Sequence, residues 1–179
     1  GMISFMNIDW TFDGHAVNQP RQPVVRVSFD EAQAFCRALS RKAGASISLP
    51  TEEQWEWACR AGTATALWYG SPDADFSSCE NLAGREVRAF VRYEKVYPAW
   101  FLREDRYDDG AAVAAAVGSY RPNPWGLYDM AGNICEWTRS RYAGAGAEAQ
   151  MVVRGGSWAD RPIEARSAFR WKYPTWQRI

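Results

Sequence analysis

The chain has 179 residues with 21 basic and 21 acidic side chains, so its formal net charge is zero. A neutral chain offers no basic field to nucleic acid or to an anionic membrane, and no apolar run approaches the ~20 residues of a membrane span. A chain of this length can bury a substantial core. We therefore expect one domain whose partners include neither nucleic acid nor a membrane.

Ten tryptophans and fourteen glycines are the strongest compositional bias. Tryptophan brings a large area to bury and an N–H that needs a partner, whereas glycine marks non-helical backbone. The bias predicts a loop-rich domain pinned by aromatic side chains. Four cysteines lack C-x-x-C spacing, so a zinc site is not expected, and they form either two disulfides or four buried thiols: Cys36, Cys59, Cys79 and Cys135.

The N-terminal part carries few signals. Residues 1–22 are interpreted as an extension or as incomplete first strands, and the turn former Asp13-Gly14 allows a strand pair or an ordered tail. Gly1-Met2 resembles an expression scar and shows no signal peptide. The single histidine, His15, is read as an ordinary surface residue. The β-branched run Pro23–Val27 predicts a strand that opens the main domain, residues 23–179.

Two capping boxes predict two helices. Ser28 with Glu31 opens the first, which continues at helical spacing to Ala43 and ends at Gly44. Thr51 with Gln54 opens the second, which runs to about Arg60, before Gly62.

The chain after Gly62 reads as loop for some sixty residues, and Ala111–Val117 is alanine-rich but short for a helix. A loop of this length requires a metal, a disulfide or aromatic packing to hold it. Strands are predicted at Val152–Trp158, where a glycine pair indicates a bulge, and at Ala165–Trp171.

The stretch Asn123–Trp137, NPWGLYDMAGNICEW, combines turn formers with two spaced carboxylates, Asp129 and Glu136. Their oxygens can converge on a hard cation such as calcium, which takes 6–8 oxygen ligands. The alternative is a tight turn whose carboxylates accept hydrogen bonds from neighbouring backbone N–H groups. Spacing alone favours this second interpretation.

Four segments in order, PVVRVSFDEAQAFCRALS, LPTEEQWEWACRAG, NPWGLYDMAGNICEW and VVRGGSW, resemble the formylglycine-generating enzyme (sulfatase-modifying factor) family. The resemblance runs from about Pro23 to Arg170. It implies an α+β fold of the C-type-lectin-like type, in which the two capped helices pack on a small antiparallel sheet. Members also carry a closing C-terminal strand that this chain lacks, so an open sheet edge allows self-association.

The resemblance further implies two structural calcium sites. The first combines carboxylates with backbone carbonyls, from Asp129, Gly132, Ile134 and Glu136. The second ties the long loop together through Asn81, Leu82, Asp109 and Ala111, although the spacing around Arg85–Arg103 departs from the family. Calcium use favours a periplasmic or extracellular setting.

One departure concerns catalysis. Formylglycine-generating enzymes bind copper(I), a soft ion suited to thiolates, through two cysteines shortly after the GGS motif. Residues 158–166 contain no cysteine, so we expect no copper and no oxidase activity. Cys36 and Cys59 fall where some members have disulfides, but their partner positions are not cysteine, which favours buried free thiols.

The resulting hypothesis is a non-catalytic, calcium-stabilised binding or scaffold module for a protein, peptide or glycan. Its candidate ligand-binding residues lie in the C-terminal segment: Asp160, Arg161, Arg166 and Trp176. Two alternatives remain, an oxidoreductase of the formylglycine-generating type and a variable ligand-binding protein of a diversity-generating retroelement.

Overall fold

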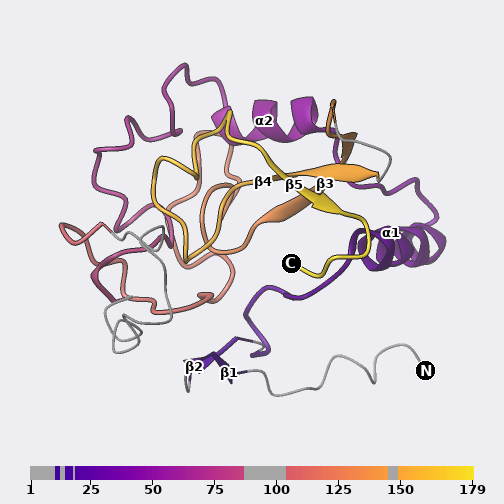
Figure 1. Cartoon of the computed structure of the whole chain (residues 1–179), viewed down its shortest axis with the longest axis horizontal. Helices are drawn as coiled ribbons and strands as arrows, with labels where there is room; N and C mark the ends of the chain where they lie inside the picture. The colour runs from indigo at the N-terminus through magenta and orange to yellow at the C-terminus, as the bar shows by residue number, and fades with distance from the viewer. Residues whose placement is uncertain (1–10, 13–14, 18, 87–103, 145–148) are drawn as a thin grey trace.

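The computed structural model describes residues 11–12, 15–17, 19–86, 104–144 and 149–179 (Figure 1). Most of Arg85–Arg103 therefore lies outside the described residues. The elements are β1 (Thr11–Phe12), β2 (His15–Ala16), α1 (Phe29–Ala43), α2 (Glu52–Arg60), β3 (Glu136–Arg141), β4 (Gln150–Arg154) and β5 (Trp171–Pro174). No described helix is long and apolar enough to cross a membrane.

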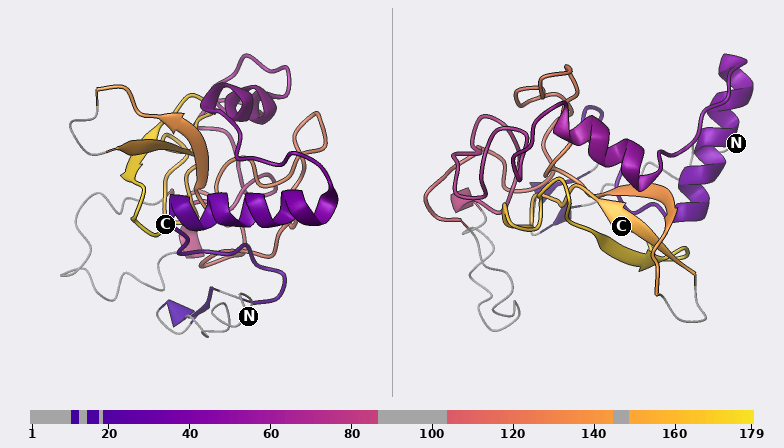
Figure 2. Two further views of the ribbon diagram at one scale, coloured as in Figure 1. Left: turned by 90° about the vertical axis from the view of Figure 1, so that its right-hand side faces the viewer. Right: turned by 90° about the horizontal axis from the view of Figure 1, so that it is seen from above.

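A three-stranded antiparallel sheet, in the order β3-β4-β5, is the centre of the fold. Helix α2 lies along one face of it, and α1 lies near the end where the chain terminates (Figures 1 and 2). Side chains alternate between the faces of a strand, so Val153 of β4 packs with Trp137 of β3 and Phe29 of α1, while Arg154 faces α2. Helix α2 therefore covers part of the sheet, whereas α1 meets it through its first turn, where Phe29 is the buried residue of that helix.

Both predicted helices are confirmed together with their caps. The Ser28 hydroxyl accepts the Glu31 N–H at 3.2 Å, the Glu31 carboxylate accepts the Ser28 N–H at 2.9 Å, and Gly44 ends α1 in the left-handed conformation. Thr51 and Gln54 form the same reciprocal pair at the start of α2. The residue that ends α2 is Ala61, with φ of 47°, one residue before the glycine that marks the stop in the sequence.

The strand predictions were less accurate. The prediction at Pro23–Val27 was wrong: Arg26 has a φ of 60°, which interrupts the extended backbone, and only Val27 exchanges two hydrogen bonds, with Ile179. The prediction at Ala165–Trp171 was also wrong, since β5 begins at Trp171. Strand β4 ends at Arg154 because the next two glycines take positive φ, and the sequence did not reveal β3. Strands β1 and β2 pair antiparallel, which is the first of the two alternatives left open for the N-terminal part.

Aromatic and aliphatic packing holds the long loop, as its composition predicted. Leu67, Phe76 and Leu82 bury themselves against Ala131 and Ala165, which come from the far end of the chain. Residues 111–117 are irregular and contain no helix. All four cysteines are free thiols: Cys59 and Cys79 are buried, and Cys36 and Cys135 are partly buried.

Candidate functional site

Several residues of the stretch 123–137 have left-handed backbone, among them Asp129 with a φ of 54°, Gly132 with 70° and Asn133 with 60°. A glycine is required at position 132 because the φ is positive and because there is no room for a side chain. A Cβ at this position would lie 2.3 Å from the carbonyl oxygen of Asn81. The contact brings the Asn81 loop directly against the stretch, so the two predicted ligand sets are neighbours.

Two buried asparagines connect these loops. The Asn133 N–H donates to the Asn81 carbonyl at 2.7 Å, and the Asn81 side-chain amide donates to Asn133 Oδ1 at 3.1 Å and to the Val113 carbonyl at 2.9 Å. Asn133 Oδ1 also accepts the Ala115 N–H at 2.8 Å. Both donors of the Asn81 amide are used, but its Oδ1 is buried and receives no hydrogen bond from any described residue.

The first predicted group of calcium ligands lies where residues 123–137 meet α2. Asp129 Oδ2 accepts the Gly118 N–H at 2.7 Å, whereas its Oδ1 is buried with no donor among the described residues. Glu136 Oε2 accepts the Trp55 indole N–H at 2.6 Å. Burial raises the pKa of Glu136, the Trp55 hydrogen bond opposes that rise, and the nearby Asp129 charge adds to it.

The Ile134 carbonyl, which belongs to the first predicted group of calcium ligands, lies beside Gly155 together with a second carbonyl. The carbonyl oxygens of Met130 and Ile134 would lie 3.6 and 3.9 Å from a Cβ built on Gly155, so both face the same glycine. The structure thus brings Asp129 and Glu136 into electrostatic contact and places the Ile134 carbonyl beside Gly155. The same Cβ would lie 3.4 Å from the Trp55 ring, so the space beside Gly155 is narrow.

Asp109 links the residues of the second predicted group of calcium ligands through two hydrogen bonds. Its Oδ2 accepts the Leu82 N–H at 2.9 Å and its Oδ1 accepts the Ala111 N–H at 3.0 Å. Asn81, with its unpaired Oδ1, directly precedes Leu82. Burial raises the pKa of Asp109 to about 6, and the two backbone hydrogen bonds oppose the rise.

Carboxylates alone do not make either set a metal centre. The described residues contain no group of three or more His, Cys, Asp or Glu side chains arranged to hold a metal ion. A cation at these positions would depend on amide and carbonyl oxygens together with the carboxylates. That donor set is hard and oxygen-only, which suits calcium and does not suit copper.

The segment after the glycine pair folds back on itself. Asp160 Oδ2 accepts the backbone N–H of Ser157 at 2.8 Å and its hydroxyl at 2.7 Å. Burial raises the pKa of Asp160, and the Ser157 hydrogen bonds oppose that rise. Arg161 pairs with Glu164, and Ala165 is buried against Gly156. The turn is thus closed by its own side chains and contains no thiol.

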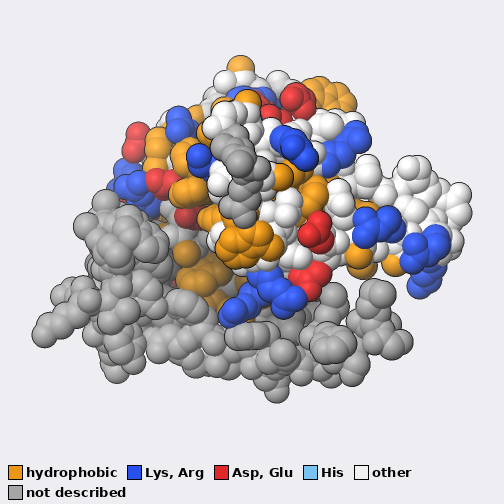
Figure 3. Space-filling model, turned by 45° about the vertical axis from the view of Figure 1, so that its right-hand side comes forward, with side chains coloured by type: hydrophobic (Ala, Val, Ile, Leu, Met, Phe, Trp, Pro, Cys, Tyr) orange, Lys and Arg blue, Asp and Glu red, His pale blue; other side chains and the backbone are white. Residues whose placement is uncertain are grey.

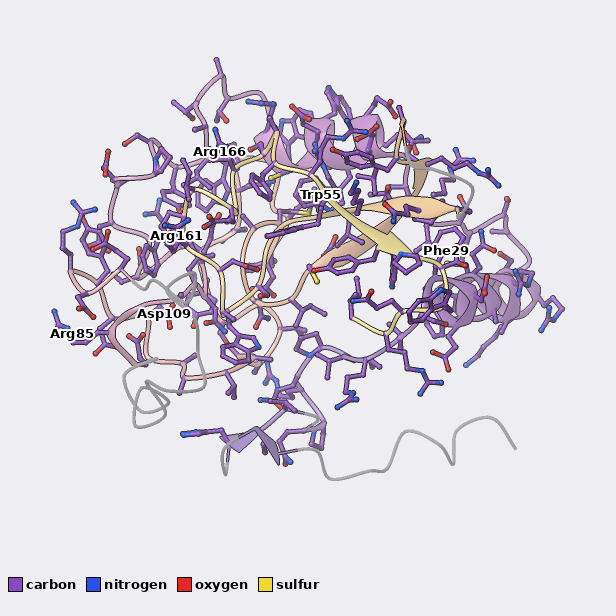
Figure 4. The ribbon with its side chains drawn as sticks, in the orientation of Figure 1. Phe29, Trp55, Arg85, Asp109, Arg161 and Arg166 are labelled. Carbon is purple, nitrogen blue, oxygen red and sulfur yellow. The ribbon has the colours of Figure 1, made fainter. Side chains whose placement is uncertain are left out.

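The predicted ligand-binding residues do not meet in one place. Arg166 donates from Nε to the Ile163 carbonyl at 2.7 Å, and Figure 4 shows Arg161 and Arg166 on the loop side of the molecule, away from Phe29. Trp176 is 67% exposed and follows Thr175, whose carbonyl accepts the Phe29 N–H. Trp176 therefore lies at the α1 end.

The structure contains two features that sequence reasoning missed. Glu80 is fully buried, accepts the Tyr69 hydroxyl at 2.8 Å, and has a pKa raised by burial to about 8. A mainly apolar cavity of about 450 Å³ is lined by residues from several segments, among them Val27, Cys135 and Ile179. No local pattern marks either feature, because each depends on contacts between distant segments.

The model of the family described as "Sulfatase-modifying factor enzyme 1-like domain" matches residues 4–178. Inactive C-alpha-formylglycine-generating enzyme 2 of Mus musculus is 34% identical over 140 residues, which are 77% of this chain and 38% of that protein. Formylglycine-generating enzyme of Streptomyces coelicolor is 30% identical over 154 residues, covering 78% of this chain and 43% of that protein.

A similar solved structure is that of Treponema denticola variable protein 1, with a TM-score of 0.67 and 22% identity over 90% of this chain and 69% of that one. This likeness confirms the α+β, C-type-lectin-like fold. The chain spans about two fifths of the length of the two enzyme-named relatives.

Proposed function

Since this chain belongs to the sulfatase-modifying factor enzyme 1-like family, we propose that it is a non-catalytic, calcium-stabilised binding module of that family. Its relatives include a protein named inactive and proteins named as formylglycine-generating enzymes, so membership alone does not choose between binding and catalysis. The choice between binding and catalysis depends on two regions: the loops that carry the predicted calcium ligands, and the turn after the glycine pair, where copper would bind.

The observation that carries the calcium proposal is a pair of unsatisfied oxygens. Asn81 Oδ1 and Asp129 Oδ1 are buried without a donor in the described part of the chain, one in each predicted ligand set. A buried acceptor left unpaired costs on the order of 1–3 kcal/mol, and a bound cation removes that cost. Asn81, Leu82, Asp109 and Ala111 would hold one ion, and Asp129, Gly132, Ile134 and Glu136 the other. Each ion would then cross-link separate loops.

The closed turn at residues 157–165 supports the non-catalytic part. Thiolates are the ligands that copper(I) requires, and here the acceptor next to Ser157 is the Asp160 carboxylate, which is already engaged. Burial raises the pKa of two described thiols, Cys59 and Cys135, to about 12, which keeps both protonated at neutral pH.

Calcium titration with thermal unfolding tests the metal proposal. If the folded state alone binds, stabilisation follows mass action and reaches about 2.7 kcal/mol at a free calcium concentration 100 times Kd. We expect the melting temperature to rise with calcium and to fall when a chelator removes it. An unchanged melting temperature in both conditions would refute the calcium sites.

The alternative of an oxidoreductase is tested by loading the protein with copper(I) and supplying a Cys-x-Pro-x-Arg peptide under oxygen. We expect no mass change at the peptide cysteine. Conversion of that cysteine to formylglycine would overturn the non-catalytic reading without affecting the calcium proposal.

The partner of the module is proposed to be a protein, peptide or glycan. Figure 3 shows acidic and basic side chains interspersed on the face it presents, with hydrophobic side chains gathered between them. Such a mixed surface suits a defined ligand better than a polyanion. A variable ligand-binding role is a second candidate, because the variable protein of Treponema denticola shares the fold.

A further inference from the structure

The apolar cavity of about 450 Å³ lies between the start of α1 and the start of β3. Three of its lining residues, Val27, Ala32 and Ile179, pack against the buried cluster of Phe29 and Trp137 and yet remain partly exposed. Cavities lined by apolar side chains take up benzene at only about 150 Å³, a third of this volume. The protein therefore has room for a larger apolar group beside its core.

The polar side chains of the lining are already paired within the protein. The Trp137 indole N–H donates to a backbone carbonyl at 3.0 Å, and the Ser157 hydroxyl donates to Asp160 Oδ2 at 2.7 Å. Glu136 Oε2 accepts the Trp55 indole N–H at 2.6 Å. None of the buried side-chain nitrogen and oxygen atoms that lack a partner in the described chain belongs to the lining. The lining therefore leaves no polar atom in need of a ligand, which favours an apolar occupant.

The distribution of the lining residues indicates the shape of that occupant. The lining follows the chain for four consecutive residues, 134–137, which span about 10 Å at the rise of a strand. A second segment, residues 24–27, contributes three valines. Cys135 adds a thiol that behaves as a small hydrophobic group. A slot of this length accommodates a flexible, unbranched alkyl chain.

Two exposed arginines flank residues of the lining. Arg26 lies between two lining valines, and Arg178, whose side chain is 60% exposed, directly precedes Ile179. Arg178 is paired with Glu31. The acidic residue of the lining, Glu136, is bonded to an indole of α2. The charge at the rim therefore favours a carboxylate, which a guanidinium group binds with matching geometry.

We propose that this cavity binds the alkyl chain of a medium-chain monocarboxylic acid, with the carboxylate held at the rim beside Arg26. The inference goes beyond the binding role proposed above. The cavity is lined in part by Ile134 and Glu136, but the ligand uses none of the oxygens assigned to calcium. The cavity and the calcium sites can therefore fail separately.

Titration calorimetry on the unmodified protein tests the proposal with hexanoate, octanoate and decanoate, each below its micelle concentration. We expect saturable one-to-one binding that strengthens about tenfold for each two further buried CH₂ groups. Decanol and decylammonium have the same chain without the negative charge, and decanol should bind about threefold more weakly than decanoate. The absence of saturable binding, or equal affinity for decanoate and decylammonium, would overturn the proposal.

The cysteines report where the ligand binds. Saturating decanoate should slow the alkylation of Cys135 by N-ethylmaleimide about fivefold, because the ligand blocks access to the thiol. Cys36 of α1 is also partly buried but lies outside the lining, so its rate should not change. Mass spectrometry of the tryptic peptides measures both rates. Protection of both thiols alike, or of neither, would contradict the assignment.

Variants of the lining and of the rim complete the test. Val25→Phe fills the cavity and should weaken decanoate binding about tenfold. The matched control, Val117→Phe, makes the same change at a valine outside the lining and should leave the affinity unchanged. Arg26→Gln should weaken decanoate about threefold and leave decanol unchanged. Unchanged binding by a folded Val25→Phe variant would refute the site, and equal losses for decanoate and decanol in Arg26→Gln would refute the role of the arginine. If Val25→Phe does not fold, the chain-length series and the protection of Cys135 still decide the proposal.

Discussion

The loops that meet at Asn81 and the turn that follows Gly156 are neighbours, since the Ala83 N–H donates to the Asp160 carbonyl at 2.9 Å, yet they satisfy their polar groups differently. Around Asn81 and Asp129, buried oxygens lack donors within the described chain. In the turn, Asp160 and Arg161 are paired with residues three positions away. The first region thus keeps the unpaired oxygens on which the calcium proposal rests, whereas the side chains of the second pair with one another.

The largest effect is expected from Gly132→Ala. Its Cβ would lie 2.3 Å from the Asn81 carbonyl, at a residue whose φ is already positive, so the two loops must separate. We expect a loss of roughly 3–5 kcal/mol in the free energy of unfolding, measured by urea denaturation. The matched control is Gly126→Ala, which has a similar φ of 80° but nothing within 4 Å, and should lose only about 1–2 kcal/mol. Equal losses would show that the close approach is unimportant.

The helices were predictable and the site only partly so. Capping boxes at Ser28 and Thr51 are local, so the sequence reveals them. The strand errors come from tertiary context: a positive φ at Arg26 breaks one predicted strand, and β3 overlaps a stretch that reads as turns. Residue spacing favoured a self-satisfied turn at Asp129. Only the family resemblance paired Asn81 with Asp109, and only the fold shows which oxygen atoms lack donors.

The second prediction concerns pH in calcium-free buffer. The pKa of Glu80 rises from 4.5 unfolded to about 8 folded, mainly through burial, so the folded state holds its proton more tightly. Its contribution to stability is complete below about pH 4.5 and is lost as pH rises through about 8. We expect the melting temperature to fall from pH 5 to pH 8.5, and E80Q to flatten that fall. An identical slope in E80Q would assign the effect to other groups.

The third prediction contrasts the two regions directly. Asp129→Asn removes a partly buried charge but keeps an acceptor for the Gly118 N–H, so without calcium its melting temperature should be equal or higher. In calcium, its stabilisation should be less than half that of the unchanged protein. Asp160→Asn weakens the Ser157 hydrogen bonds and should cost about 1–2 kcal/mol, with the calcium response intact. If both variants lost the calcium response equally, the two regions would not differ in their contribution to calcium binding.

The smallest effect is expected from Arg161→Gln. The Arg161–Glu164 pair is partly exposed, with 37% of the arginine side chain accessible, and exposed pairs contribute about 0–1 kcal/mol. The free energy of unfolding, with and without calcium, should therefore fall by less than about 1 kcal/mol. A larger loss would mean that the turn depends on this pair more than on Asp160.

The paired hydrogen bonds between Val27 and Ile179 can form only after all the residues between them have been synthesised. Val27, two residues before α1, must wait until Ile179 has been made before it finds its partner. At about 5–20 residues per second, the intervening chain takes roughly 8–30 s to appear. Phe29 likewise waits for Trp137. During that interval Phe29, the buried residue of α1, has no sheet to pack against.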